Sequence, residues 1–177
     1  MKELRYTLIS GSWRTTSEEV EMDVKEEVRR IFNKDNRGII TGGALGVDYF
    51  ATDEAIILDP KIERTLIYLP TTLVKYAEHY LRKAAEGVIL KRQAKAIINQ
   101  LEVILERNPS ALIENPRRKI VSKREYYERI RKMVDRATNT SAFQVNNSQG
   151  VQYSIDYTRS QSKKVRVKKY LIPQKEP

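Results

Sequence analysis

The sequence predicts an α/β protein in three layers, with a parallel sheet of about five strands and helices on both faces. Three observations predict this class. Short apolar runs alternate along the chain with longer segments in which apolar residues recur every three or four positions. The links between these segments are short, and a glycine-rich turn joins the second apolar run to a helical one. The chain has 177 residues, so we expect a single domain over residues 1–177.

The first expected strand and helix lie within the N-terminal 33 residues. Residues 5–10 have the apolar and β-branched composition of a strand. Ser17 is a suitable N-cap for a helix over residues 18–33, because two glutamates follow it in the first turn. The apolar residues of this helix recur at helical spacing and are Val20, Val24, Val28 and Ile31.

The stretch RGIITGGALGVDYFATDE at residues 37–54 is the feature around which the rest of the chain is organised. Ile39 and Ile40 indicate a second strand, and an apolar helical run begins at Val47. Glycines in the turn between them allow positive φ and let a ligand approach the backbone closely. The free N–H groups at the helix start, together with the helix dipole, favour an anion, most often a phosphate. The alternative is a tight strand-to-helix turn without a ligand.

The third expected strand covers residues 62–69, after a proline that ends the preceding helix. Three helices then follow: one opened by Thr72, one over about residues 91–107 and one opened by Ser122. A single helix would suffice for this crossover, so we expect a helical insert at about residues 71–121 between strands 3 and 4. The additional helices could form a lid or a subunit contact, or they could simply thicken the domain.

The sheet is expected to resume at residues 140–145, followed by the loop NNSQG at residues 146–150. A helix with Val151 and Ile155 on its apolar face comes next, and the last strand is expected at about residues 165–172.

Three loops follow parallel strands and open helices, at residues 11–14, 42–46 and 146–150. In an open α/β sheet, the ligand lies beyond the carboxyl ends of the strands, where the strand order reverses. If the first and fourth strands are neighbours, the first and third loops flank that crevice. Arg14 could hold a phosphate with its planar set of donors. The candidate nucleotide- or phosphate-binding residues in these loops or directly after them are Gly11, Ser12, Arg14, Thr15, Gly42, Gly43, Ala44, Gly46, Asp48, Asn146, Asn147, Ser148 and Gly150.

Three further side chains each allow two interpretations. Asp48 could complement the dipole of its own helix, or it could accept hydrogen bonds from a ribose or a base. Trp13 could stack on a base or pack against a neighbouring helix. His79, the only histidine, is expected to be a surface or packed residue rather than a ligand-binding one.

The net charge of +10 is unevenly distributed. Residues 115–177 hold 16 Lys and Arg against 5 Asp and Glu, whereas the rest of the chain is nearly balanced. Such an excess attracts polyanions, although a charge-rich surface is also typical of heat-adapted proteins. If nucleic acid is the partner, the candidate contacts are Arg117, Arg118, Lys119, Lys163, Lys164, Arg166, Lys168 and Lys169.

Composition also excludes several classes of function. The chain has no cysteine, which excludes disulfides and thiolate metal sites, and no group of residues has metal-ligand spacing. No apolar run approaches the roughly 20 residues that cross a bilayer, and no signal peptide is visible. We expect a cytoplasmic protein without a membrane partner or a metal. No nucleophile stands in an activating context, so no catalytic residue is assigned.

The loop sequences resemble those of a known family. The loop with Gly11, Ser12 and Arg14, the stretch GGALGVD and the late N-S-x-G are similar to motifs of the Rossmann-like domain of the DNA-processing protein A (Smf) family. The wider superfamily includes the Lonely-guy cytokinin-activating enzymes and nucleotide-sensing domains of antiviral systems. The resemblance covers about residues 5–170 outside the insert and implies a Rossmann-like fold. It also adds Arg129 to the candidate phosphate-binding residues, on a helix that carries Tyr126, Arg129 and Ile130.

The sequence departs from both families at defined positions. Thr52 stands where the DNA-processing family usually has histidine, and we expect no winged-helix extension within residues 1–177, although some members of that family carry one. Lonely-guy enzymes carry P-G-G-x-G-T-x-x-E, whereas this chain has VNNSQGVQYS, with no Pro-Gly-Gly and no glutamate after the glycine.

The resemblance therefore implies a nucleotide- or nucleotide-derivative-binding protein, a sensor or carrier rather than a catalyst. We expect that the protein requires no cofactor other than a possible bound nucleotide, and that its partner is a phosphorylated, nucleotide-like small molecule. One alternative is a single-stranded DNA-binding protein, and another is a phosphoribohydrolase of the Lonely-guy type. Relatives of this kind often pair, so we also expect a homodimer.

Overall fold

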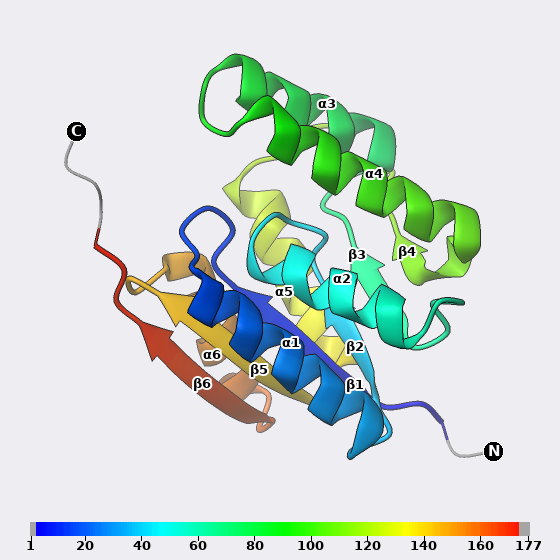
Figure 1. Cartoon of the computed structure of the whole chain (residues 1–177), viewed down its shortest axis with the longest axis vertical. Coiled ribbons are helices and arrows are strands. Elements are labelled where there is room, and N and C mark those ends of the chain that lie inside the picture. Colours follow the sequence, from blue (N-terminus) through cyan, green and yellow to red (C-terminus); the bar gives the residue numbers. More distant parts are fainter. Residues whose placement is uncertain (1–2, 174–177) are drawn as a thin grey trace.

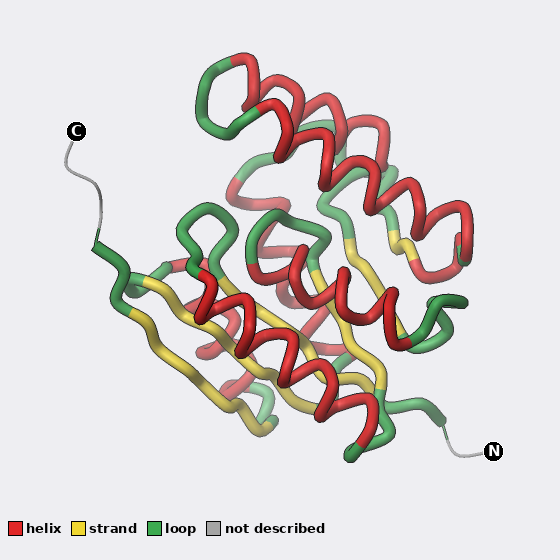
Figure 2. Tube along the Cα trace, viewed as in Figure 1, coloured by secondary structure: helices red, strands yellow, loops and turns green. Residues whose placement is uncertain are grey.

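The computed structural model describes residues 3–173 and contains one six-stranded parallel sheet. The strand order is β4-β3-β2-β1-β5-β6 (Figure 2). Figure 1 shows α1 and α2 in front of this sheet and α5 and α6 behind it. The strands are β1 (Tyr6–Gly11), β2 (Gly38–Thr41), β3 (Thr65–Tyr68), β4 (Leu112–Ile113), β5 (Asn139–Val145) and β6 (Lys164–Tyr170). The helices are α1 (Glu18–Asn33), α2 (Val47–Leu58), α3 (Leu73–Ala85), α4 (Lys91–Arg107), the short 3-10 helix η1 (Pro109–Ala111), α5 (Lys123–Arg136) and α6 (Gln149–Ser160).

The predicted three-layer α/β class is confirmed, with six strands instead of about five. The additional strand is β4, which has two residues and pairs with the end of β3 at the edge of the sheet. Two residues are too few to show the alternation by which a strand is recognised in a sequence. The backbone N–H of Leu69 donates to the Ile113 carbonyl at 2.9 Å and extends the same pairing.

The pairing of β1 with β5 confirms the condition on which the expected crevice depends. Leu8 lies opposite Thr140 and Gly11 lies opposite Phe143 in this parallel pair. From β1, the chain adds β2, β3 and β4 on one side, and β5 and β6 on the other. The strand order therefore reverses between β1 and β5, and the loops that follow these two strands lie next to each other.

Helix α1 begins and ends at the predicted residues. The Ser17 side chain accepts a hydrogen bond from the backbone N–H of Val20 at 3.3 Å, which caps the helix start. The apolar face predicted from the sequence is fully buried against β1, β2 and α2. Local capping and helical spacing thus determine this element.

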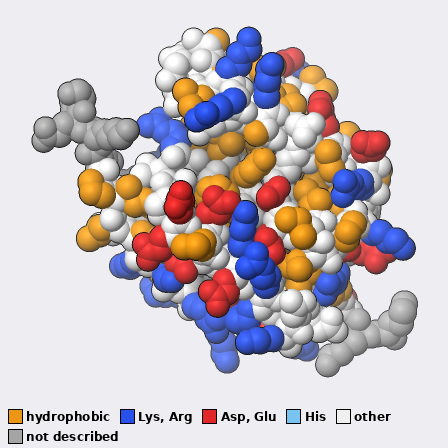
Figure 3. Space-filling model, in the orientation of Figure 1, with side chains coloured by type: hydrophobic (Ala, Val, Ile, Leu, Met, Phe, Trp, Pro, Cys, Tyr) orange, Lys and Arg blue, Asp and Glu red, His pale blue; other side chains and the backbone are white. Residues whose placement is uncertain are grey.

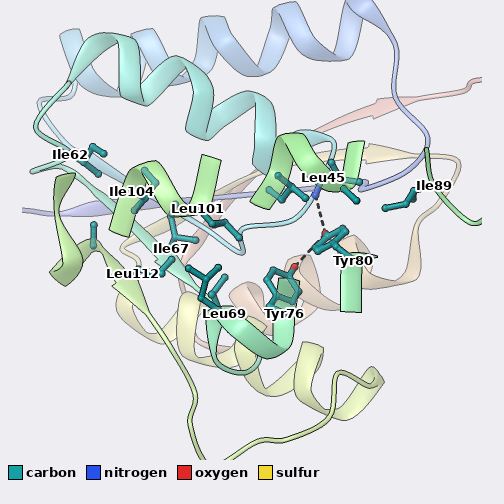
Figure 4. Packing of buried hydrophobic residues seen from close by; sticks show 14 residues of the cluster. Leu45, Ile62, Ile67, Leu69, Tyr76, Tyr80, Ile89, Leu101, Ile104 and Leu112 are labelled. Carbon is teal, nitrogen blue, oxygen red and sulfur yellow. Dashed lines mark hydrogen bonds between the residues drawn. The ribbon is translucent and has the colours of Figure 1, made fainter. Parts of the chain in front are cut away.

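The insert shares a hydrophobic core with the edge of the sheet. Figure 4 shows Tyr76, Leu101 and Ile104 from α3 and α4 beside Ile67 of β3 and Leu112 of β4. These side chains are at most 7% exposed. The hairpin of α3 and α4 is therefore an integral part of the domain. Within residues 3–173, none of the helices is long and apolar enough to cross a membrane.

Candidate functional site

A crevice with a volume of about 670 Å³ opens at the carboxyl ends of β1 and β5. Its walls come from five places: the loop after β1, the loop before α2, the insert helix α3, the start of α5 and the start of α6. The sequence predicted the loops but not the contribution of α3. The predicted site residues that line it are Gly11, Ala44, Asp48, Arg129, Ser148 and Gly150.

The glycine-rich loop before α2 is closed by the protein's own side chains. Asp48 Oδ2 accepts hydrogen bonds from the backbone N–H groups of Gly42 at 3.0 Å and Ala44 at 3.3 Å. The N–H of Leu45 donates to the Tyr80 hydroxyl at 3.2 Å. The N–H of Val47 donates to a backbone carbonyl of the first loop. Four of the N–H groups expected to be free for an anion, those of Gly42, Ala44, Leu45 and Val47, are therefore occupied by partners within the protein.

Two glycines of this loop are required by packing. Gly43 has φ of 62°, and a Cβ there would lie 2.9 Å from side-chain atoms of Ile67 and Leu69 in the core. Gly46 has φ of 70°, and its Cβ would lie 2.3 Å from the Ser12 carbonyl oxygen. A valine at position 43 would therefore disturb the core, so this change cannot test ligand binding in an intact fold.

Arg129 of α5 reaches the same loop from the back of the crevice. Its Nη1 donates to the Gly42 carbonyl at 2.6 Å, and its guanidinium lies 5.0 Å from the centre of the Tyr126 ring. Burial raises the pKa of Asp48 from 3.8 to about 6, although Arg129 and the two backbone N–H groups lower it. The Nε of Arg129 is buried and has no hydrogen-bond partner within residues 3–173.

The loop before α6 is open where the glycine-rich loop is closed. In the described part of the chain, the backbone N–H groups of Gln149, Gly150 and Val151 make no hydrogen bond, and all three residues line the crevice. A Cβ on Gly150 would have no neighbouring atom of the described residues within 4 Å, so there is open space at this residue of the crevice wall. Asn146 instead pairs with the backbone of Ile172 at 2.8 and 2.9 Å and does not line the crevice.

The loop after β1 has a structural part and an exposed part. Ser12 is 6% exposed, and its hydroxyl accepts a hydrogen bond from the Val145 N–H at 3.3 Å, which ties the first loop to the end of β5. Trp13 is 40% exposed and lines the crevice. The Arg14 guanidinium lies 5.4 Å from the centre of its ring. Arg14, Thr15 and Asn147 are at the surface but are not part of the crevice wall.

Several crevice residues were not predicted as binding residues. His79, Arg82 and Lys83 come from α3, and Lys123 and Tyr127 come from the start of α5. The sequence does contain a signal for a binding role of this helix, namely the basic residues Arg82 and Lys83 that follow His79. That signal becomes interpretable only when the packing of α3 against the sheet is known.

The basic residues proposed for nucleic acid do not form one surface. Lys163 donates to the last carbonyls of α5 at 2.7 and 2.8 Å, which is the end of the sheet opposite the crevice. Arg166 and Lys168 pair with Glu27 and Asp23 of α1. Figure 3 shows basic and acidic side chains next to each other on this face. Arg118 pairs with an acidic residue of α5 at 2.7 Å, and none of the eight candidates lines the crevice.

The fold and the position of the crevice define a Rossmann-like α/β protein whose candidate ligand site lies where the strand order reverses. The structure is similar to that of DNA processing protein A from Helicobacter pylori, with 20% sequence identity and a TM-score of 0.62. It is also similar to DNA processing protein A from Streptococcus pneumoniae, with 12% identity and a TM-score of 0.51. A third similar structure is that of TM1055, with 11% identity and a TM-score of 0.52.

These alignments cover most of this chain and part of the other proteins. They include 97% of this chain with the H. pylori protein and 92% with each of the other two. The chain spans 66% of the H. pylori protein, 58% of the S. pneumoniae protein and 72% of TM1055, so it covers less than two thirds of both DNA processing proteins. No protein-family model and no curated protein matches the sequence. The resemblance in the loop sequences is thus confirmed at the level of the fold.

Proposed function

We propose that the crevice binds a nucleotide or a nucleotide derivative, and that the protein acts as a sensor or carrier of this ligand. The observation that carries the proposal is the open start of α6. Three adjacent backbone N–H groups there lack partners in the described structure, and their residues line the crevice. Unpaired N–H groups at the positive end of a helix dipole are suited to a phosphate.

The charge of the crevice wall supports an anionic ligand. Among the described lining residues, Arg82, Lys83, Lys123 and Arg129 contribute four cations, and Asp48 contributes one carboxylate. Glu86, the residue directly after α3, pairs with Lys83 at 2.9 Å and with Arg82 at 4.0 Å and so neutralises part of this charge. The remaining excess of positive charge raises the local concentration of phosphates.

Aromatic side chains at the rim support a base next to the phosphate. Trp13 lines the crevice and is exposed, and Tyr127 lines it from α5. Tyr127 is itself stacked on Tyr153, with ring centres 4.2 Å apart. A base can stack on such a fixed aromatic face, and stacking contributes about 1–3 kcal/mol per base.

The chain offers a direct test, because Trp13 is its only tryptophan. Titration with nucleoside monophosphates should change Trp13 fluorescence, and Gly150→Leu should abolish the change by filling the space in front of α6. Because a Cβ at this position has no neighbouring atom of the described residues within 4 Å, and leucine favours a helix more than glycine, the variant should fold. Gly150→Ala is the matched control and should bind more tightly than Gly150→Leu. Unaltered binding by a folded Gly150→Leu protein would contradict the proposed site.

A second candidate function is the binding of single-stranded DNA, whose nucleotides would occupy the crevice. The similar H. pylori protein is described as having a unique single-stranded DNA binding mode. In this chain, Lys123 lies at the crevice and makes no ion pair within residues 3–173. Lys123→Glu should then weaken oligonucleotide binding, whereas Lys169→Glu on the exposed edge strand should not. For DNA, the logarithm of affinity should fall steeply with the logarithm of salt concentration, by about 0.7 per phosphate contacted. A single nucleotide should show a shallow dependence.

A further inference from the structure

His79 joins the insert to α5 across the wall of the crevice. The residue is 9% exposed. Its Nδ1 lies 3.4 Å from Nη2 of Arg82, one turn further along α3. Its Nε2 lies 3.4 Å from the hydroxyl oxygen of Tyr126 on α5. All three side chains line the crevice, so a continuous hydrogen-bonded row crosses from one helix to the other.

The direction of each hydrogen bond in this row follows from the groups involved. A guanidinium only donates, so Nδ1 of His79 must accept from Arg82. In a neutral imidazole the proton then lies on Nε2, and Nε2 donates to the Tyr126 oxygen. Burial and the charges of Arg82 and Lys83 lower the pKa of His79, which favours this neutral ring. The Tyr126 oxygen is therefore an acceptor towards His79, and its own proton points elsewhere.

Within the described residues, the Tyr126 hydroxyl makes no second hydrogen bond. The Arg129 guanidinium lies over the Tyr126 ring, 5.0 Å from its centre, and helps to hold it. The hydroxyl is therefore fixed in position in the wall of the crevice, which Arg82 and the start of α6 also line. A fixed donor that lacks an acceptor in the protein is suited to an oxygen atom of a ligand.

We propose that the Tyr126 hydroxyl donates a hydrogen bond to a phosphoryl oxygen of the bound nucleotide, and that His79 is the positioning residue that orients it. This inference rests on the proposed function of the crevice. It assigns a role to the insert, because α3 supplies the group that directs a donor of α5. It also assigns phosphate recognition to a side chain in addition to the backbone of α6.

The test is a double-mutant cycle on nucleoside monophosphate binding, measured by Trp13 fluorescence. Tyr126→Phe removes the donor and keeps the ring, and His79→Phe removes the orienting group. Each should weaken binding by about tenfold, and the double variant should also lose about tenfold, because His79 acts through Tyr126. His79→Gln retains an N–H donor and should bind within about threefold of the wild type. Tyr157→Phe, which removes a tyrosine hydroxyl on α6 outside the crevice, is the matched control and should bind as the wild type does.

Binding of the same nucleosides without a phosphate shows whether the Tyr126 hydroxyl recognises the phosphate or another part of the ligand. Tyr126→Phe should leave nucleoside affinity unchanged, and an equal loss for nucleoside and monophosphate would overturn the assignment to phosphate. Monophosphate binding that Tyr126→Phe leaves intact would overturn the inference and preserve the proposed function. Losses that multiply to about a hundredfold in the double variant would overturn the role of His79. Absence of any nucleotide binding by the wild type would overturn both proposals.

Discussion

Replacing Asp48 with asparagine should change how the stability of the protein depends on pH. Asp48 is 7% exposed, and burial raises its pKa from 3.8 to about 6. The folded protein therefore binds a proton more strongly than the unfolded chain does. The stabilisation from that proton is fully present below about pH 4 and is lost as the pH rises through about 6. A pKa increase of about two units corresponds to about 3 kcal/mol.

Asp48→Asn removes this titration and keeps the shape of the side chain. Its amide oxygen can accept the N–H groups of Gly42 and Ala44 in place of the carboxylate oxygen. The free energy of unfolding of the variant minus that of the wild type should thus increase by about 3 kcal/mol between about pH 4 and pH 8. Other titrating groups are common to both proteins and cancel in this difference.

The measurement is urea unfolding of both proteins at several pH values across that range. A difference that stays constant would show that the backbone N–H groups and Arg129 fully offset the burial of the carboxylate. A difference that decreases with pH would show that they lower its pKa below 3.8. Either result would refute the conclusion that burial dominates at Asp48.

Three further predictions concern stability and are checked by urea unfolding at neutral pH. Gly46→Ala should destabilise the fold by more than about 3 kcal/mol, because the new Cβ meets a carbonyl oxygen at 2.3 Å at a residue with positive φ. Its control, Gly87→Ala, has φ of 73° and open space and should cost about 1 kcal/mol, so similar costs for the two variants would contradict the packing argument. Leu101→Ala should lower the free energy of unfolding by about 2–5 kcal/mol, because Leu101 is 1% exposed. Leu105→Ala, at a residue 40% exposed on the same helix, should lower it by less than about 1 kcal/mol, and equal losses would contradict the hydrophobic core between the insert and the sheet. Ser17→Ala should cost about 1 kcal/mol, and no loss would mean that water caps α1 equally well.

The parts of the fold that the sequence predicted are those that depend on local signals. Helix α1 has the predicted bounds because a capping serine and a regular row of valines lie within one helix. The handedness of crossovers allowed the adjacency of β1 and β5, and the structure confirms it. The strand β4 could not be predicted, because a two-residue strand exists only through its pairing with β3.

The candidate site was predictable in position and not in its chemistry. Spacing along the chain placed the loops at one end of the sheet, where the structure has them. The closure of the glycine-rich loop was not predictable, because Tyr80 reaches Leu45 from 35 positions away, and no local pattern reports such a contact. The same holds for His79, whose importance depends on the packing of α3 near α5.

The hairpin of α3 and α4 has two tasks that cannot be separated. Its apolar side completes the core at the β3 edge, and its polar side faces the crevice. A shorter connection from β3 to β4 would expose the sheet edge and at the same time remove one wall of the crevice. Changes that adapt the protein to a different ligand at this wall must therefore preserve the helix that stabilises it.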